Sequence, residues 1–138
     1  MRQGEAVFVD SGAWIALALS RDPLHVPAHE QWNLLQGAGA ELHTSVPVVI
    51  ETFTFLDRNA NRDVALAWKG AVYKPGVAKI LPCELRDLEA SWAYFRRVDL
   101  HKLSAVDATS FAIMKRARIR LAYTFDRHFA VVGFRLVG

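Results

Sequence analysis

Four acidic side chains interrupt strongly apolar stretches of this sequence, and they are the residues best suited to metal binding or catalysis. Asp10 and Asp126 each follow a short run rich in Val, Phe or Tyr, whereas Glu51 and Asp107 lie inside apolar segments. If the four carboxylates converge, their mutual repulsion raises their pKa values, and a hard divalent cation such as Mg²⁺ or Mn²⁺ relieves it. Such a cation can orient a phosphodiester and activate a water molecule. The acids therefore predict metal-assisted phosphodiester hydrolysis.

Each acid also has a structural interpretation. Asp10 precedes Ser11, where a helix is expected to begin, so it can serve as an N-cap. Ser104 and Asp107 have the spacing of a capping box, in which the acid reaches back to the cap residue. Asp126 can start a turn at the end of its strand. Taken singly, these three acids are ordinary, and only their convergence would indicate a site.

Glu51 is the hardest acid to explain structurally. In a helix it shares a face with Val48 and Phe55, both apolar. An ionised carboxylate on a buried face costs several kcal/mol unless it is paired or bound to a metal. An ion pair with an arginine is the main alternative to a metal site.

The elements that must position these acids alternate between strands and helices. We expect strands at 6–9, 42–46, 77–81, from Leu121 and at 134–137, and helices at 11–19, 26–36, 47–56, 63–73, 84–98 and 104–119. Such alternation implies a mostly parallel sheet covered by helices on both faces. Ligands of open α/β sheets bind at the carboxyl ends of the strands, where Asp10 and Asp126 fall.

Two of these helices carry further expectations. The segment 47–56 begins with Pro47, which suits a first helical turn, although its β-branched and aromatic residues also permit a strand. The segment 84–98 has apolar residues at the spacing of an amphipathic helix, namely Leu85, Leu88, Trp92 and Phe95. We therefore expect one helix over 84–98 whose stripe of apolar residues is buried.

Composition limits the class of protein. The 138 residues are 52% hydrophobic, which favours one folded domain spanning 1–138 and argues against disorder. A lone Cys83 excludes a disulfide and a Cys/His zinc set. No apolar run is long enough to span a bilayer, and no signal peptide precedes the first strand, so we expect a cytoplasmic protein with no membrane association.

The positive charge suits a polyanionic partner. The formal net charge is +3, and the densest basic run contains Lys115, Arg116, Arg118 and Arg120. These four residues are candidates for contacts with an RNA backbone. Cations at the end of a helix also oppose the macrodipole, so a structural role is an equal alternative.

In its ordered motifs the chain resembles the PIN-domain ribonucleases, in particular the toxin components of VapBC toxin–antitoxin pairs. The matching motifs are Val9-Asp10-Ser11, Glu51, Leu103-Ser104-Ala105-Val106-Asp107-Ala108 and Thr124-Phe125-Asp126-Arg127-His128-Phe129, of which the last two are the most specific. The resemblance implies a three-layer α/β/α sandwich with a central, mostly parallel sheet. It also implies a homodimer, a cognate VapB-type antitoxin and an RNA substrate.

The same resemblance assigns residues. Asp10, Glu51, Asp107 and Asp126 match the family's acidic quartet, which holds Mg²⁺ or Mn²⁺ for endonucleolytic cleavage of RNA. Ser11 and Thr124 match positions whose hydroxyl groups lie beside the metal, and we list them as supporting residues. Asp99 and His128 lie close to these motifs in sequence, but a solvated loop acid and a neighbouring loop residue are the simpler interpretations.

Other functions stay open at this point. A PIN nuclease of RNA maturation or turnover would carry the same acids, and a non-catalytic PIN-like module that binds RNA or protein would be expected to lose some. A receiver domain or an aspartate-nucleophile phosphatase also places acids at strand ends. The phosphatase, however, needs Asp-x-Asp where this chain has Asp10-Ser11-Gly12.

Overall fold

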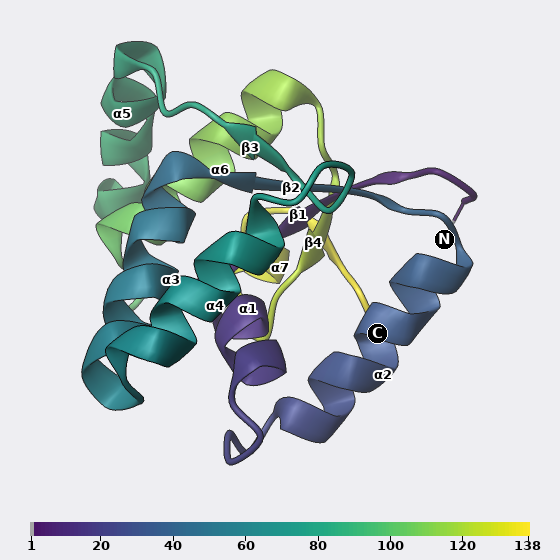
Figure 1. Ribbon diagram of the computed structural model, residues 1–138. Coiled ribbons are helices and arrows are strands. Elements are labelled where there is room, and N and C mark those ends of the chain that lie inside the picture. The colour runs from purple at the N-terminus through teal and green to yellow at the C-terminus, as the bar shows by residue number, and fades with distance from the viewer. Residues whose placement is uncertain (1) are drawn as a thin grey trace.

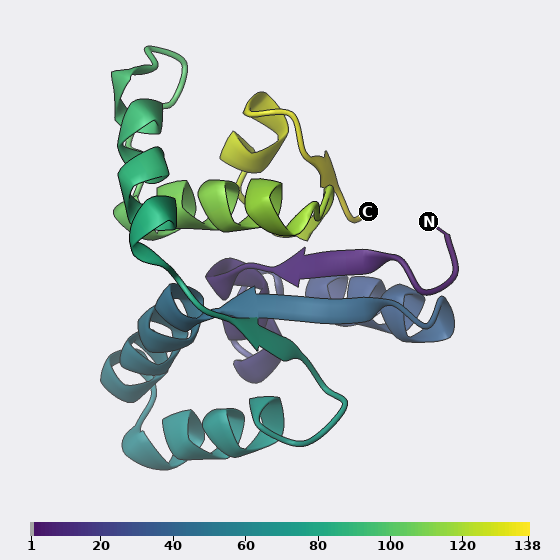
Figure 2. The same cartoon turned by 90° about the horizontal axis from the view of Figure 1, so that it is seen from above.

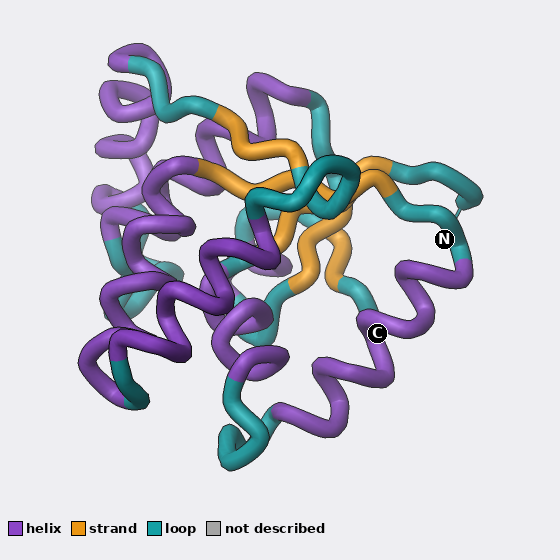
Figure 3. The backbone as a smooth tube through the Cα atoms, in the orientation of Figure 1, coloured by secondary structure: helices purple, strands orange, loops and turns teal. Residues whose placement is uncertain are grey.

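A central sheet of five parallel strands organises the chain. The computed structural model describes residues 2–138. The strands lie in the order β3-β2-β1-β4-β5, and Figures 1 and 3 show them crossing the middle of the molecule. Their bounds are β1 Ala6–Val9, β2 Glu41–Ser45, β3 Lys79–Leu81, β4 Leu121–Tyr123 and β5 Arg135–Leu136. Because all pairs are parallel, every carboxyl end lies at the same edge.

Helices cover both faces of this sheet, which confirms the three-layer α/β/α prediction. Figure 2 shows α6 and α7 on one side of the strands, and α3 and α4 on the other. The helices are α1 Ser11–Ala18, α2 His25–Gly37, α3 Val46–Asn59, α4 Arg62–Val72, α5 Leu85–Ser91, the 3-10 helix η1 Trp92–Arg96, α6 Ala105–Ala117 and α7 His128–Val131. No helix within residues 2–138 is long and apolar enough to cross a membrane.

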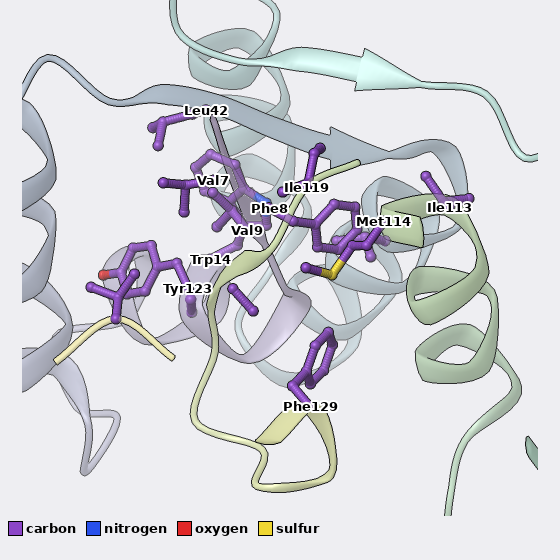
Figure 4. Close-up of a cluster of buried hydrophobic side chains, with 14 of the residues drawn as sticks. Val7, Phe8, Val9, Trp14, Leu42, Ile113, Met114, Ile119, Tyr123 and Phe129 are labelled. Carbon is purple, nitrogen blue, oxygen red and sulfur yellow. The ribbon is translucent and has the colours of Figure 1, made fainter. Parts of the chain in front are cut away.

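The core is centred on β1, the middle strand. Val7, Phe8 and Val9 are fully buried, because helices pack on both sides of the sheet and leave this strand no solvent-facing side. Figure 4 shows these side chains together with Tyr123 and Phe129, which are also fully buried. The rigid centre of the sheet thus ends directly at Asp10.

The helical prediction for 47–56 is confirmed. Ser45 caps α3 by accepting a hydrogen bond from the Val48 N–H at 3.3 Å, and Pro47 occupies the first turn. A proline in this position loses no helical hydrogen bond, because the first N–H groups of a helix have no partner within it. Glu51 therefore lies one turn into a well-started helix.

The prediction of one amphipathic helix over 84–98 is wrong. The segment forms α5 and then the short 3-10 helix η1. Leu85 is 71% exposed, and Trp92 and Phe95 are about half exposed. The inward residues of α5 are polar instead, because Asp87 binds Arg116 of α6 through two hydrogen bonds of 2.8 Å.

Candidate metal centre

Strand register places the first acid beside the last strand. Val9 pairs with Tyr123, and the Asp10 N–H donates to the Tyr123 carbonyl at 3.0 Å. The next residue of each strand therefore leaves the sheet at the same point. Thr124 Oγ1 donates to the Asp10 carboxylate at 2.9 Å and accepts the Asp126 N–H at 3.0 Å. One hydroxyl group thus orients Asp10 and the loop that carries Asp126.

Asp10 is buried without a cationic partner. Its side chain makes no capping hydrogen bond to α1, so the N-cap interpretation does not account for the carboxylate. Its Oδ1 atom is buried and has no hydrogen-bond partner. Burial, together with the nearby charges of Glu51 and Asp126, raises the pKa of Asp10 to about 6, although the hydrogen bond from Thr124 lowers it.

Glu51 approaches the same edge from α3. The Ser11 hydroxyl donates to its carboxylate at 2.5 Å. Within residues 2–138 no arginine or lysine forms an ion pair with Glu51, so the structural alternative raised from the sequence is not realised. Its charge contributes to the raised pKa values of both buried aspartates.

Asp107 enters the site from the first turn of α6. The Ser104 side chain caps this helix by accepting the Asp107 N–H at 3.0 Å. The reciprocal bond of a capping box, from the Ser104 N–H to the Asp107 carboxylate, is not formed. Burial, together with the neighbouring Asp10, Asp126 and Glu51, raises the pKa of Asp107 to about 9. Asp107 therefore binds its proton more tightly than Asp10 does.

Asp126 and His128 complete the cluster from the loop after β4. The His128 N–H donates to Asp126 Oδ1 at 2.8 Å, and its Nδ1 atom lies 3.2 Å from the same oxygen. One ligand atom from each of Asp107, Asp126 and His128 can lie within 4.8 Å of the other two. The sequence interpretation of His128 as a mere loop neighbour missed this placement. Its position two residues after Asp126 was the available signal.

The donor set fits a hard divalent cation. Asp10, Glu51, Asp107 and Asp126 supply carboxylate oxygens, which Mg²⁺ and Mn²⁺ prefer. Among the described residues no lysine or arginine neutralises any of the four. A buried oxygen of Asp10 without a partner and two raised pKa values indicate charge that the protein alone does not compensate. The acidic cluster can therefore bind a metal ion.

The remaining candidate residues lie elsewhere. Asp99 pairs with Arg97 at 2.6 Å rather than joining the cluster. In the basic run, Arg116 binds Asp87, and Lys115 lies 5.3 Å from the centre of the Tyr94 ring. The other two members of the run, Arg118 and Arg120, line a hollow at the amino ends of the strands. The basic run thus divides into a structural pair and a surface pair.

Comparisons with known proteins agree with this fold. A family model described as PIN domain matches residues 7–135. The 23S rRNA-specific endonuclease VapC20 of Mycobacterium tuberculosis (strain ATCC 25618 / H37Rv) is 34% identical over 128 residues, covering 93% of this chain and 95% of that protein.

Solved structures with a similar fold include VapC proteins. The crystal structure of Mycobacterium tuberculosis VapC20, described as a sarcin-ricin loop cleaving toxin, superposes with a TM-score of 0.82 at 33% identity over 93% of this chain and 95% of that one. VapBC2 from Rickettsia felis, bound to a promoter DNA fragment, gives 0.72 at 8% identity over 95% of this chain and 96% of that one, a likeness of fold alone. With a matching family model and a relative of this identity, the chain belongs to the PIN domain family.

Proposed function

We propose that this chain is a metal-dependent endoribonuclease and the toxin of a type II toxin–antitoxin pair. The observation that carries the proposal is an acidic cluster at one sheet edge. Asp107 and Asp126 lie within metal-binding reach of each other and of His128, Asp10 shares the Thr124 hydroxyl with the Asp126 loop, and the charge of Glu51 acts on both buried aspartates. The 34% identical relative is a 23S rRNA-specific endonuclease, which supports the choice of RNA. The RNA substrate itself suggests that the protein acts in the cytoplasm.

We propose that Asp10, Glu51, Asp107 and Asp126 hold Mg²⁺ or Mn²⁺. When bound, such an ion orients the scissile phosphate, lowers the pKa of a water molecule and stabilises the leaving oxygen. Thr124 fixes the Asp10 carboxylate, and Ser11 fixes that of Glu51, so both acids are oriented before any ligand arrives. Asp107 carries a proton near neutral pH and has to release it to become a ligand.

The proposed partners follow from the family and its solved complexes. VapBC assemblies of Rickettsia felis and Salmonella typhimurium share the fold of this chain. We accordingly propose a VapB-type antitoxin and a homodimer as the forms in which the protein occurs.

Cleavage of a mixed pool of structured RNAs, ribosomal RNA included, tests the activity. We expect cuts by antitoxin-free protein with Mg²⁺ or Mn²⁺, and none with EDTA or with a folded Asp10→Asn variant. Absence of cutting by metal-loaded wild-type protein on every RNA would contradict the nuclease and leave a binding module instead.

A further inference from the structure

A cluster of arginines surrounds a hollow at the edge of the sheet opposite the acids. The hollow measures about 600 Å³ and is lined by Arg2, Arg118, Arg120, Arg135, Glu5 and Glu41. Four guanidinium groups against two carboxylates leave an excess of positive charge. The acid cluster lies at the carboxyl ends of the strands, so this hollow is a separate feature.

Three of the four guanidinium groups in the hollow form no ion pair within residues 2–138. Arg135 pairs with Glu5. Within residues 2–138, the guanidinium groups of Arg2, Arg118 and Arg120 make no hydrogen bond or ion pair. Elsewhere in the chain, arginines such as Arg116 and Arg97 bind carboxylates at 2.6 to 2.8 Å. The three free guanidinium groups are therefore available to a ligand.

Arg118 has a left-handed backbone conformation that is usually adopted by glycine. It is the C-cap of α6 and has a φ of +58°, in the left-handed region. Glycine is the usual residue at the left-handed end of a helix, because a Cβ atom is strained there. The chain instead places a long cationic side chain at this point, beside the hollow. The backbone alone does not require an arginine here.

From these observations we propose that the arginine hollow is a second RNA contact that binds backbone phosphates outside the catalytic edge. This proposal rests on the proposed ribonuclease function. Guanidinium groups present fork-shaped donor pairs that match phosphate oxygens, and they retain their charge at every physiological pH. Such contacts strengthen and orient the binding of RNA without reading its sequence.

The fold sets the distance that an RNA has to cover. Asp107 and Arg118 lie at opposite ends of α6, and eleven residues of helix span about 16 Å. Along a duplex, at about 3.4 Å per base pair, the two sites are therefore about five base pairs apart. A dinucleotide cut at the acid cluster is too short to reach the hollow, whereas a folded RNA can.

The test uses a double variant, Arg118→Gly with Arg120→Gln, in the full chain. Binding to an RNA hairpin of about 30 nucleotides is measured by fluorescence anisotropy in EDTA, where no cleavage occurs. We expect a loss of affinity of at least about tenfold at 0.1 M salt, and a salt slope smaller by about 1.5 to 2, as two phosphate contacts would give. Glycine at position 118 relieves the left-handed strain, so the melting temperature is not expected to fall.

Two controls make this result specific. Lys69→Gln with Lys74→Gln removes the same charge from the surface at α4 and the turn after it, and we expect a much smaller loss. With Mn²⁺ present, we expect the arginine variant to raise KM for the hairpin and to leave dinucleotide cleavage unchanged. Equal losses of hairpin affinity in both double variants, or no loss in the arginine variant, would contradict the proposed RNA contact at the hollow. Failure of the wild type to cut any RNA would instead contradict the ribonuclease.

The same measurement with duplex DNA of the hairpin sequence distinguishes the two sources of backbone phosphate. Because the contacts removed are to the backbone, we expect the double variant to lose at least as much affinity for RNA as for DNA. A loss confined to DNA would contradict an RNA contact.

Discussion

Two buried aspartates near α6 show opposite solutions to the same problem. Asp87 is 2% exposed and binds Arg116, which lowers its pKa below the ordinary value. Asp107 is 9% exposed, faces other acids and has a pKa raised to about 9. Both carboxyl groups lie in low-dielectric surroundings, but only one has a counter-charge. Burial alone therefore does not distinguish a structural acid from a functional one.

The absence of a cationic partner is the informative feature. A buried ion pair is self-contained, because each charge neutralises the other. In a cluster of carboxylates without such a partner, the charges repel one another until a proton or a metal ion binds. Within residues 2–138, an arginine pairs with Asp87, whereas no lysine or arginine pairs with the four acids of the candidate metal centre. Exchanging or removing these charges tests the difference directly.

The largest expected effect is on activity at the acid edge. Asp107→Asn removes one proposed metal ligand, a carboxyl group that has to lose its proton before it can bind a cation. We expect RNA cleavage to fall by at least about a thousandfold, since the site loses ligand charge at the reacting phosphate. The metal-free variant should melt no lower than the wild type. Retention of more than a tenth of the activity in single-turnover assays would contradict the role of Asp107.

Asp87→Asn should give the reverse pattern. The change removes the carboxylate nearest to Arg116, whose side chain is only 25% exposed, and leaves Glu84 at 3.6 Å as its other acidic partner. We expect a loss of about 2 kcal/mol in unfolding free energy, measured by urea denaturation. Cleavage per folded molecule should stay close to that of the wild type. A stable Asp87→Asn variant that has lost activity would contradict a purely structural role for Asp87.

The stability of the metal-free protein should depend on pH with a defined sign. Asp10 and Asp107 bind their protons more tightly in the folded chain, with pKa values of about 6 and about 9 against 3.8 as the ordinary value. Between about pH 4 and 9 the folded state therefore holds more protons, and its stability falls as pH rises. Denaturation in EDTA at several pH values measures this slope. Asp107→Asn should flatten it above pH 6, and an unchanged slope would contradict the raised pKa.

A smaller effect is expected at Thr124. Thr124→Val removes the hydroxyl group that donates to Asp10 and accepts the Asp126 N–H. Groups that orient metal ligands typically contribute about 10- to 100-fold to affinity or activity. We expect a loss in this range for Mn²⁺ affinity and for cleavage. Thr52→Val, also a buried hydroxyl but without a hydrogen-bond partner, is the matched control and should change neither.

Much of the architecture was predictable because periodic patterns report burial. The β1 run and the Pro47 start of α3 correctly located Asp10 and Glu51. The stripe at 84–98 failed because Leu85 and Trp92 face solvent while polar Asp87 turns inward to Arg116, a contact 29 residues away along the chain. Such long-range pairing has no local signal.

The site was only partly predictable for a related reason. The sequence could name the four acids but not show that they lack cationic partners, which depends on where each arginine folds. The sequence also did not place His128 in the site. Its ring lies beside the acids because the His128 N–H donates a hydrogen bond to Asp126, which folds the segment after β4 back on itself. The metal-ligand roles themselves remain a prediction for experiment.

Calorimetric titration of Mn²⁺ at pH 7.5, in buffers of different ionisation enthalpy, tests the central claim most directly. Because the pKa of Asp107 lies near 9 in the metal-free protein, ligation should expel a proton. We expect close to one proton released for each binding event in the wild type, and much weaker binding with little proton release in Asp107→Asn. Equal affinity in both proteins without proton release would show that the acid cluster does not bind the metal through Asp107.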